Sequence, residues 1–318
     1  MMSVPMDNNT PDQPLLNQYE DEIDLRELFA VLWAGKLKII AITAIFAVAS
    51  VIYALSVPNQ YKATALLAPA QADGGGLSGA LGQLGGLASL AGVSLGGGKS
   101  GEAQIAQEIM KSWSYIEGFI ADNNIAAEVY AAEGWSKGSN TLQIDGDVYD
   151  AELKKWFVED ESGAIGPPSS WQLFEAFSQM LSVSEDKKSG LVSVSIEYYS
   201  PQIAKQWVDL YVQSVNRFMQ QRQVDKVTRN INYLQEQIEK TSIAEMQEVF
   251  YTIIEEQTKN KMLAEASPDY VFVAVGPSMV PEQKSQPKRA LIFILGALLG
   301  GMLSVLLVLI MHYARKSD

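Results

Sequence analysis

The stretch that decides the fold begins QIAKQWVDLYVQSV at Gln202 and ends NKMLAEAS at Ser267, and its 66 residues contain neither glycine nor proline. Apolar residues recur along it at spacings of three and four, which is the period of an amphipathic helix. A continuous helix of this length would reach on the order of 100 Å. We therefore predict one very long helix over residues 202–267, with a break near Thr241-Ser242 as the alternative.

A helix this long has more apolar surface than one globular core can cover, so neighbouring chains must cover its sides. Ile231 and Leu234 belong to an apolar row that also contains Val227 and Ile238. They are the candidate oligomer-packing residues, whereas we expect Gln235 to be exposed and dispensable. The pattern predicts subunits that stand side by side and share walls of long helices.

Strands flank the long helix on both sides. Residues 191–199 (LVSVSIEYY) alternate apolar and polar side chains, as in a strand with one buried face. Ser200 and Pro201 then form an N-cap and first-turn pair that starts the helix. Residues 61–67 (YKATALL) and 270–275 (YVFVAV) are two further strands, which indicates a mixed α/β base. Shorter helices are expected over 102–120, 153–157 and 171–181.

Residues 74–101 have an unusual composition, because they hold 12 of the 24 glycines, interleaved with leucines. Glycine alone would indicate a flexible linker. The repeated leucines favour instead an apolar loop that packs against a neighbouring subunit or lines an internal space. The stretch contains no GxxxxGK[ST] motif, so a nucleotide-binding loop is not indicated.

Two runs are long and apolar enough to cross a membrane, residues 39–57 and 290–311. A cleaved signal peptide is the alternative for the first run, but an acidic segment at 20–24 precedes it, where signal peptides carry a short basic region. A buried core helix is the alternative for the second. The sequence predicts two transmembrane helices.

The distribution of basic residues predicts the orientation. Arg26, Lys36 and Lys38 precede the first run and only Lys62 follows it closely, which places the N-terminus in the cytoplasm. Two spans put both termini on one side, so the middle of the chain is exported. The predicted organisation is a cytoplasmic tail (1–36), a first span (37–57), an exported domain (58–289), a second span (290–312) and a short cytoplasmic tail (313–318). Within the first tail, we expect residues 1–18 to be disordered and residues 23–33 to form an amphipathic helix at the membrane surface.

The second span carries a small-residue face. Gly296 and Gly300 form a GxxxG motif that Gly301 extends, and such motifs allow close approach of two membrane helices. Pro281 and Pro287 precede the span. These five residues are the candidates for interaction between membrane segments, with incidental membrane glycines as the alternative.

Composition excludes several function classes. Asp and Glu number 37 against 24 Lys and Arg, and a net charge of −13 disfavours nucleic-acid binding. The chain has no cysteine and one histidine, His312, which excludes disulfides, thiolate chemistry and multi-histidine metal sites. We expect no cofactor.

Acidic and aromatic clusters suggest chemistry only weakly. Asp145, Asp147 and Asp150 lack the spacing of a calcium loop, and adjacent carboxylates at 159–161 do not define a glycosidase pair. We expect solvated turns and no enzymatic activity. Two uses are open for four tryptophans, stacking on sugar rings and packing in the core or at a subunit interface, and packing is favoured. They are Trp113, Trp135, Trp156 and Trp171.

With these residues in view, the chain resembles the polysaccharide co-polymerases, the Wzz-type O-antigen chain-length determinants. The resemblance rests on residues 21–28 (DEIDLREL), 61–63 (YKA), 200–216, and the proline- and glycine-rich second span with its preceding Pro287-Lys288-Arg289. It extends over nearly the whole chain. The Gly/Leu-rich segment 74–101 is similar to an apolar loop of some members.

The resemblance implies a multi-pass protein of the bacterial inner membrane whose bulk lies in the periplasm. It also implies a ring-shaped homo-oligomer with an α/β base and long helices, bounded by membrane lipid. The implied partners are a Wzy-type polymerase and undecaprenyl-diphosphate-linked polysaccharide. Related capsule exporters carry a C-terminal tyrosine kinase; only six residues follow the second span here, so we expect none.

Two other functions compete. A chemoreceptor-like signalling protein also has two spans, but it needs a large cytoplasmic helical domain after the second one. An adaptor for chain length or export of capsule, exopolysaccharide or enterobacterial common antigen fits the same features as the O-antigen function, and it stays open.

Overall fold

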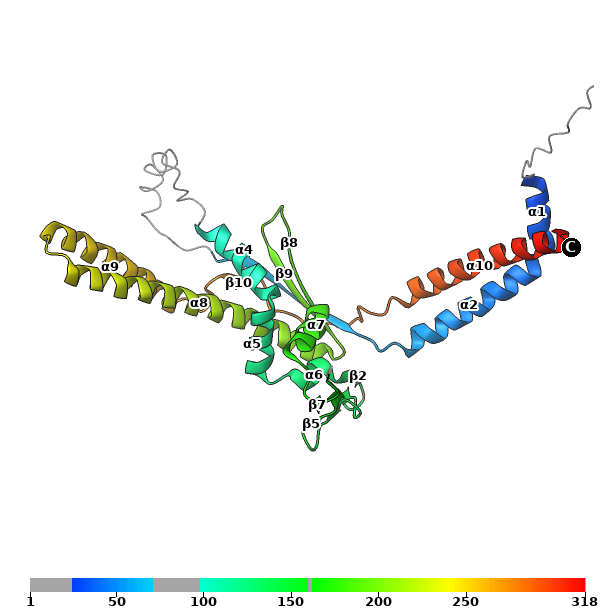
Figure 1. Cartoon of the computed structure of the whole chain (residues 1–318), viewed down its shortest axis with the longest axis horizontal. Coiled ribbons are helices and arrows are strands. Elements are labelled where there is room, and N and C mark those ends of the chain that lie inside the picture. Colours follow the sequence, from blue (N-terminus) through cyan, green and yellow to red (C-terminus); the bar gives the residue numbers. More distant parts are fainter. Residues whose placement is uncertain (1–24, 71–97, 160–161, 318) are drawn as a thin grey trace, which may run out of the picture. The chain divides into compact units, whose positions relative to one another are not determined.

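The computed structural model describes residues 25–70, 98–159 and 162–317, which fall into two compact units (Figure 1). One unit contains both ends of the chain, Met1–Leu55 and Arg289–Asp318, and the other is Ser56–Lys288. The α+β class with a long helix and two membrane-type helices is confirmed. The predicted disordered tail (1–18) and residues 74–97 of the Gly/Leu-rich segment lie outside the described residues.

A four-stranded antiparallel sheet organises the larger unit, in the order β10-β1-β9-β8. On one side of β1, Tyr61 lies opposite Tyr198 and Leu67 lies opposite Val192. On the other side of β1, Leu67 lies opposite Ala274. The three predicted strands are all present, and β8 pairs with β9 as an unpredicted fourth. The strands are β1 (Tyr61–Pro69), β8 (Leu181–Glu185), β9 (Val192–Tyr198) and β10 (Phe272–Ala274).

The predicted single helix over 202–267 is wrong in its extent. Helix α8 (Pro201–Lys240) is a long helix of 40 residues, and α9 (Ala244–Glu265) packs back along it as a second helix of 22 residues (Figure 1). The break at Thr241 is the alternative that the sequence left open. Gln247 donates through Nε2 to the carbonyl oxygens of Ile238 and Thr241, which satisfies the end of α8.

The start of α8 is as predicted. Ser200 has extended backbone angles, its Oγ accepts from the Ile203 N–H at 3.4 Å, and Pro201 occupies the first turn. Such a cap stabilises a helix by about 1 kcal/mol. Because the cap follows β9 directly, the first turns of α8 are placed against the sheet, where they pack on β1 and β9.

Four shorter helices complete the base, by which we mean the sheet, these helices and residues 201–219 of α8. The predicted helix over 102–120 is interrupted at Ser112, and the one over 171–181 begins at Ser170 behind a capping box made by Ser169 and Gln172. The helices are α4 (Gly98–Lys111), α5 (Trp113–Asn123), α6 (Ala126–Tyr130) and α7 (Ser170–Met180).

The helix predicted over 153–157 is wrong. Lys155–Trp156 is instead a two-residue strand, β5, in a group of small hairpins. Strands this short show no hydrophobic period, so they could not be predicted from the pattern of apolar residues. The pairs are β2 (Ala132–Ser136) with β3 (Thr141–Ile144), β4 (Tyr149–Asp150) with β5, and β6 (Val158–Glu159) with β7 (Ile165–Gly166).

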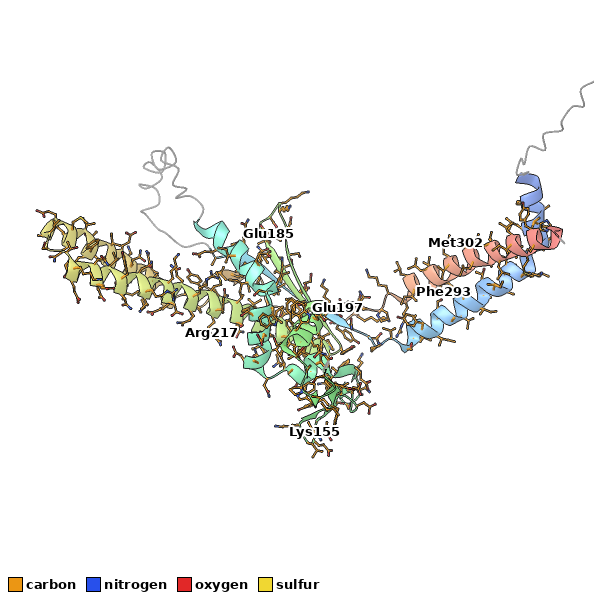
Figure 2. The ribbon with its side chains drawn as sticks, in the orientation of Figure 1. Lys155, Glu185, Glu197, Arg217, Phe293 and Met302 are labelled. Carbon is orange, nitrogen blue, oxygen red and sulfur yellow. The ribbon has the colours of Figure 1, made fainter. Side chains whose placement is uncertain are left out.

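The smaller unit consists of helices α1 (Leu25–Ala34), α2 (Lys36–Ser56) and α10 (Arg289–Ser317). The mean hydropathy is 2.4 for α2 and 2.7 for the window in α10, and only 6% and 17% of these windows are buried. Phe293 and Met302 are among the apolar side chains that α10 exposes (Figure 2). Such exposure disfavours the core-helix alternative and fits a lipid environment.

Candidate functional surfaces

The base is held together by an aromatic core that fixes the direction of α8. The Tyr211 hydroxyl donates to the carbonyl oxygen of Met110, and the Tyr115 hydroxyl donates to that of Tyr211 at 3.3 Å. The ring of Phe119 lies edge-on to Tyr211 at 4.7 Å. Burial raises the pKa of the Tyr211 hydroxyl well above its ordinary value, so it remains a neutral donor. The first turns of α8 are therefore firmly anchored.

Two amides on one face of α8 tie down the returning chain. Asn216 is buried; its Oδ1 accepts from the Val271 and Phe272 N–H groups at 3.0 and 2.9 Å, and its Nδ2 donates to the Phe272 carbonyl. One turn later, Gln220 Nε2 donates to carbonyl oxygens at the end of α9, including that of Ala264 at 2.9 Å. Asn216 was part of the sequence resemblance, and the structure gives it a physical role in joining α8 to β10.

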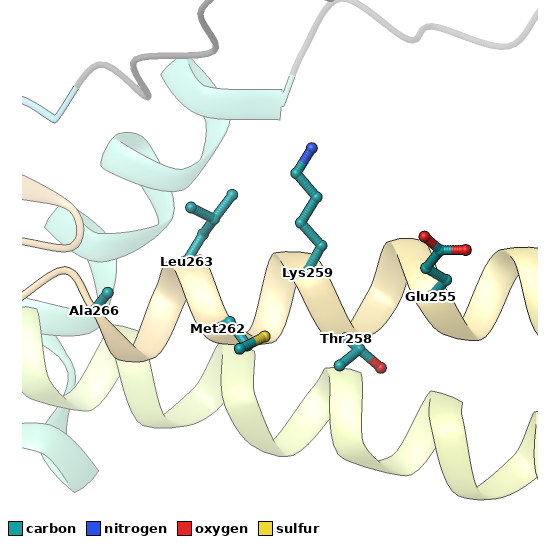
Figure 3. Close-up of a pocket in the computed structure, with 6 residues that line it drawn as sticks. All are labelled: Glu255, Thr258, Lys259, Met262, Leu263 and Ala266. Carbon is teal, nitrogen blue, oxygen red and sulfur yellow. The ribbon is translucent and has the colours of Figure 1, made fainter.

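Beyond Met219 the two helices form what we call the distal hairpin, residues 220–265, and it exposes many large apolar side chains. Met262 and Leu263 are 65% and 58% exposed, and they line a shallow hollow on α9 with Lys259 and Ala266; Leu263 and Lys259 point away from α8 (Figure 3). A surface of this kind on a thin hairpin indicates an interaction site. The other exposed apolar residues of the hairpin are Tyr233, Ile243, Met246, Val249, Tyr251 and Ile253.

The candidate packing residues Ile231 and Leu234 are half-buried and not fully exposed. They share a helix face with Val227, which is 1% exposed, and α9 packs along α8. The chain therefore covers part of this row itself, and a role of Ile231 and Leu234 in oligomer packing stays a prediction. Treating 202–267 as one helix concealed the exposed residues of α9, although their spacing at 246, 249 and 253 is helical.

The glycines of the second span lie against the first span of the same chain. A Cβ on Gly296 would come within 2.4 Å of Ser50 Cβ, and one on Gly300 within 2.6 Å of Phe46 Cβ. Only glycine permits backbones this close. Gly301 is less tightly placed, because a Cβ on it would lie 3.9 Å from the Thr43 hydroxyl oxygen. That oxygen lies 3.5 Å from the Ser304 hydroxyl oxygen.

The two prolines before the second span lie in a segment that is pinned to the start of β1. Gln60 and Gln286 form an antiparallel bridge, in which the Gln60 N–H donates to the Gln286 carbonyl at 3.1 Å. The Ser285 N–H and hydroxyl both donate to the carbonyl oxygen of Gln60. Pro287 is buried beside this bridge and Pro281 is half-buried. Their role between membrane segments stays a prediction.

The acidic clusters hold turns. Asp145 Oδ1 accepts from the Asp147 N–H at 2.9 Å, and Asp150 Oδ1 accepts from two backbone N–H groups that follow it. This is the ordinary local use of aspartate in turns. Residues 160–161 lie outside the described residues. Among the described residues, no group of three or more acidic or histidine side chains is placed to hold a metal ion.

The four tryptophans all contact side chains of their own chain. Trp135 and Trp156 are half-buried against Tyr61 and Tyr149, at 5.9 and 4.5 Å between ring centroids. Trp113 is more exposed, and its indole N–H donates to the Ser170 hydroxyl at 2.7 Å. Trp171 is also exposed and lies 5.1 Å from the ring of Phe174.

The chain thus combines two membrane-type helices, an α/β base and a distal helical hairpin. Residues 21–122 match the family model described as Wzz, chain length determinant protein, so the resemblance inferred from the sequence is confirmed over the first span, β1, α4 and most of α5. No curated protein matches the chain.

Two solved structures are similar at low identity. One, described as a full-length bacterial polysaccharide co-polymerase, is 16% identical with a TM-score of 0.39 and covers 93% of this chain and 99% of its own. The other, a fragment of WzzB, a polysaccharide co-polymerase from Salmonella Typhimurium, is 14% identical with a TM-score of 0.29 and covers 72% of this chain and 100% of its own.

Proposed function

We propose that the chain is an inner-membrane polysaccharide co-polymerase that sets the modal chain length of lipopolysaccharide O-antigen. The observation that carries the proposal is the match of residues 21–122 to the chain length determinant family. In this function a Wzy-type polymerase extends undecaprenyl-diphosphate-linked repeats, and the co-polymerase regulates it without itself making or breaking a bond.

The proposal includes a homo-oligomer. The apolar residues of the distal hairpin support it, because side chains such as Met262 and Leu263 gain free energy when a neighbour removes them from water. The exported domain (58–289) would lie in the periplasm and both tails in the cytoplasm. Alkaline phosphatase fused after Gly190 is expected to be active, and a fusion after Asp318 inactive; the reverse pattern would overturn the topology.

Deletion of the gene tests the function. The expected result is that surface O-antigen, separated on a gel, loses its modal length and that the intact gene restores it. An unchanged O-antigen ladder together with altered capsule, exopolysaccharide or enterobacterial common antigen would favour the adaptor function over the proposed one.

A matched pair of variants connects the hairpin to this function. Met262→Glu/Leu263→Glu places two charges on the exposed apolar surface, where burial in an interface would cost several kcal/mol. We expect it to weaken the oligomer and to broaden the length distribution. Asn232→Glu/Gln235→Glu adds the same charge at exposed polar positions of α8 and should leave both unchanged.

A further inference from the structure

A row of three cations on α8 stands out in an acidic protein. Arg222, Lys226 and Arg229, which we call the basic stripe, follow one another at spacings of four and three residues. At 3.6 residues per turn they share one helix face, and they extend over about 10 Å along the helix. Three like charges this close repel one another, so the arrangement is costly unless an anion offsets it.

The chain has 37 acidic residues, yet among those the structure describes none pairs with the stripe. The ion pairs found there use other cations: Lys111, Lys205, Lys240 and Lys261. The carboxylate of Asp225, at the edge of the stripe, instead accepts a hydrogen bond from Gln221 Nε2 at 2.9 Å. The three cations are exposed and available to a ligand.

The stripe borders a cavity of about 300 Å³ between α8, α4 and the segment before β10. Ile105 and Met219 give the cavity an apolar wall, while Gln223, Tyr270 and Glu102 add neutral and acidic polar groups to it. Burial, together with the nearby carboxylate of Glu102, raises the pKa of the Tyr270 hydroxyl to about 12. The cavity thus combines cations with groups that pair with hydroxyls.

The position of the cavity within the larger unit limits the choice of anion. The segments leading to the two spans meet at Gln60 and Gln286, at one end of β1. Tyr270 adjoins the other end, where Phe272 pairs with Pro69. Nine residues of strand separate these ends by about 30 Å. This distance favours a soluble polymer over a lipid headgroup as the ligand of the cavity.

From these observations we propose that the basic stripe and its cavity bind an acidic oligosaccharide, with the stripe cations pairing to carboxylates spaced along the sugar chain and the cavity's polar groups accepting and donating to sugar hydroxyls. The carboxylate of Glu102 accepts readily from hydroxyl groups, which a sugar chain offers along its whole length. The identification of the polymer as the one whose length is controlled rests on the proposed function.

Titration of full-length protein in mild detergent at low salt tests the site. Oligogalacturonate is the probe, and a neutral dextran oligosaccharide of equal length is the comparison. We expect saturable binding of oligogalacturonate that weakens with added salt, and no binding of dextran. Arg222→Gln/Lys226→Gln/Arg229→Gln should weaken oligogalacturonate binding by about tenfold or more, since hydrogen bonds between a cationic side chain and a carboxylate are stronger than neutral ones.

A matched control removes three exposed cations from turns outside the hairpin: Lys154→Gln/Lys187→Gln/Lys188→Gln. It changes the net charge equally and should leave binding within about twofold. Equal losses in both triple variants would mean that only net charge matters, and would overturn the site. Equally tight binding of inorganic pyrophosphate, or of a single-stranded oligonucleotide of equal charge, would overturn the sugar-chain specificity.

The two proposals fail separately. Circular dichroism and gel filtration of both triple variants show whether the fold is retained. Tyr270→Phe removes one hydroxyl from the cavity and is a second, milder test, with an expected loss of oligogalacturonate affinity of a few fold. The titration involves neither polymerase nor chain length. Failure of oligogalacturonate to bind would therefore overturn the site and leave the proposed function standing. An unchanged O-antigen ladder after gene deletion would overturn the proposed function and leave the binding site standing.

Discussion

The two halves of helix α8 have the same backbone and opposite surroundings. Residues 201–219 hold eight of the nine buried residues of the helix, whereas the remaining residues to Lys240 hold only Val227. The first half is packed against the sheet and against the rings of Tyr115, Phe119, Phe177 and Tyr198. Among the described residues, the second half has mainly α9 beside it. Regular secondary structure is therefore not evidence of equal stability, and most helix stability comes from packing.

The difference separates a part whose apolar residues are buried within the chain from a part whose apolar residues stay exposed. In the base, apolar burial and hydrogen-bonded tyrosines supply the stabilising free energy. In the distal hairpin, Met262, Leu263 and Tyr233 remain exposed, so much of their apolar surface adds nothing to the stability of the single chain. Figure 2 shows side chains crowded within the base and projecting outward along the hairpin.

The largest effect is expected in the base. Tyr211→Ala would remove a fully buried ring and its hydrogen bond to Met110, and large-to-small changes of this kind cost about 3–5 kcal/mol. Chemical denaturation of the full-length protein in mild detergent, followed by near-ultraviolet circular dichroism, measures the loss. Tyr211→Phe keeps the ring and should cost only about 1 kcal/mol; equal losses in the two variants would contradict the packing account.

The junction of the two halves should show the next largest effect. Asn216→Ala would leave the Val271 and Phe272 N–H groups buried without an acceptor, at about 1–3 kcal/mol for each unsatisfied group. The expected result is a lower free energy of unfolding and faster proteolysis around residue 270. Gln235→Ala, on an exposed polar position of the same helix, is the control, and a loss as large as that of Asn216→Ala would show that position along the helix does not matter.

Alkaline pH should destabilise the base. Burial raises the pKa of the Tyr198 and Tyr211 hydroxyls above the ordinary value near 10, so they bind protons more tightly in the folded state. Their contribution is complete below pH 10 and is lost as the pH rises from 10 toward the raised values, because unfolding then releases protons. The free energy of unfolding should fall above about pH 10, with a shallower slope in Tyr211→Phe; an equal slope would exclude Tyr211 as a source.

The smallest effect is expected at the exposed apolar surface of α9. Leu263→Ala removes an exposed side chain, and in the dissociated chain it should change the free energy of unfolding by no more than about 0.5 kcal/mol. In the assembled protein the same change should raise the dissociation constant, because a neighbour covers the site. Analytical ultracentrifugation over a dilution series measures the latter, and an unaltered dissociation constant would remove Leu263 from the interface.

Much of the base could be predicted from the sequence because its signals are local. Alternation in 191–199, the Ser200-Pro201 start of α8 and the second-span glycines each report a local backbone requirement. The break after Lys240 was harder to predict, since Thr241-Ser242 lacks glycine and proline and a helix period continues on both sides of it. Its cause is tertiary: the apolar row of α8 finds a partner in α9.

The candidate surfaces were predicted less well. The contact of Gly296 and Gly300 with α2 follows from the GxxxG motif, but the partner could not be known from spacing alone. Ile231 and Leu234 were selected by period, which cannot distinguish a face covered by the same chain from one covered by a neighbour. The basic stripe is visible in the sequence at 222, 226 and 229, but only the fold shows that it lacks acidic partners and borders a cavity.

Hydrogen–deuterium exchange on the full-length protein in mild detergent, above and below the concentration at which it dissociates, tests the central claim most directly. The account predicts that amides of residues 220–265 are protected in the assembled protein and lose protection on dissociation, whereas residues 201–219 are protected at both concentrations. Hairpin amides that stay equally protected at both concentrations, or a chain that is monomeric throughout, would contradict it.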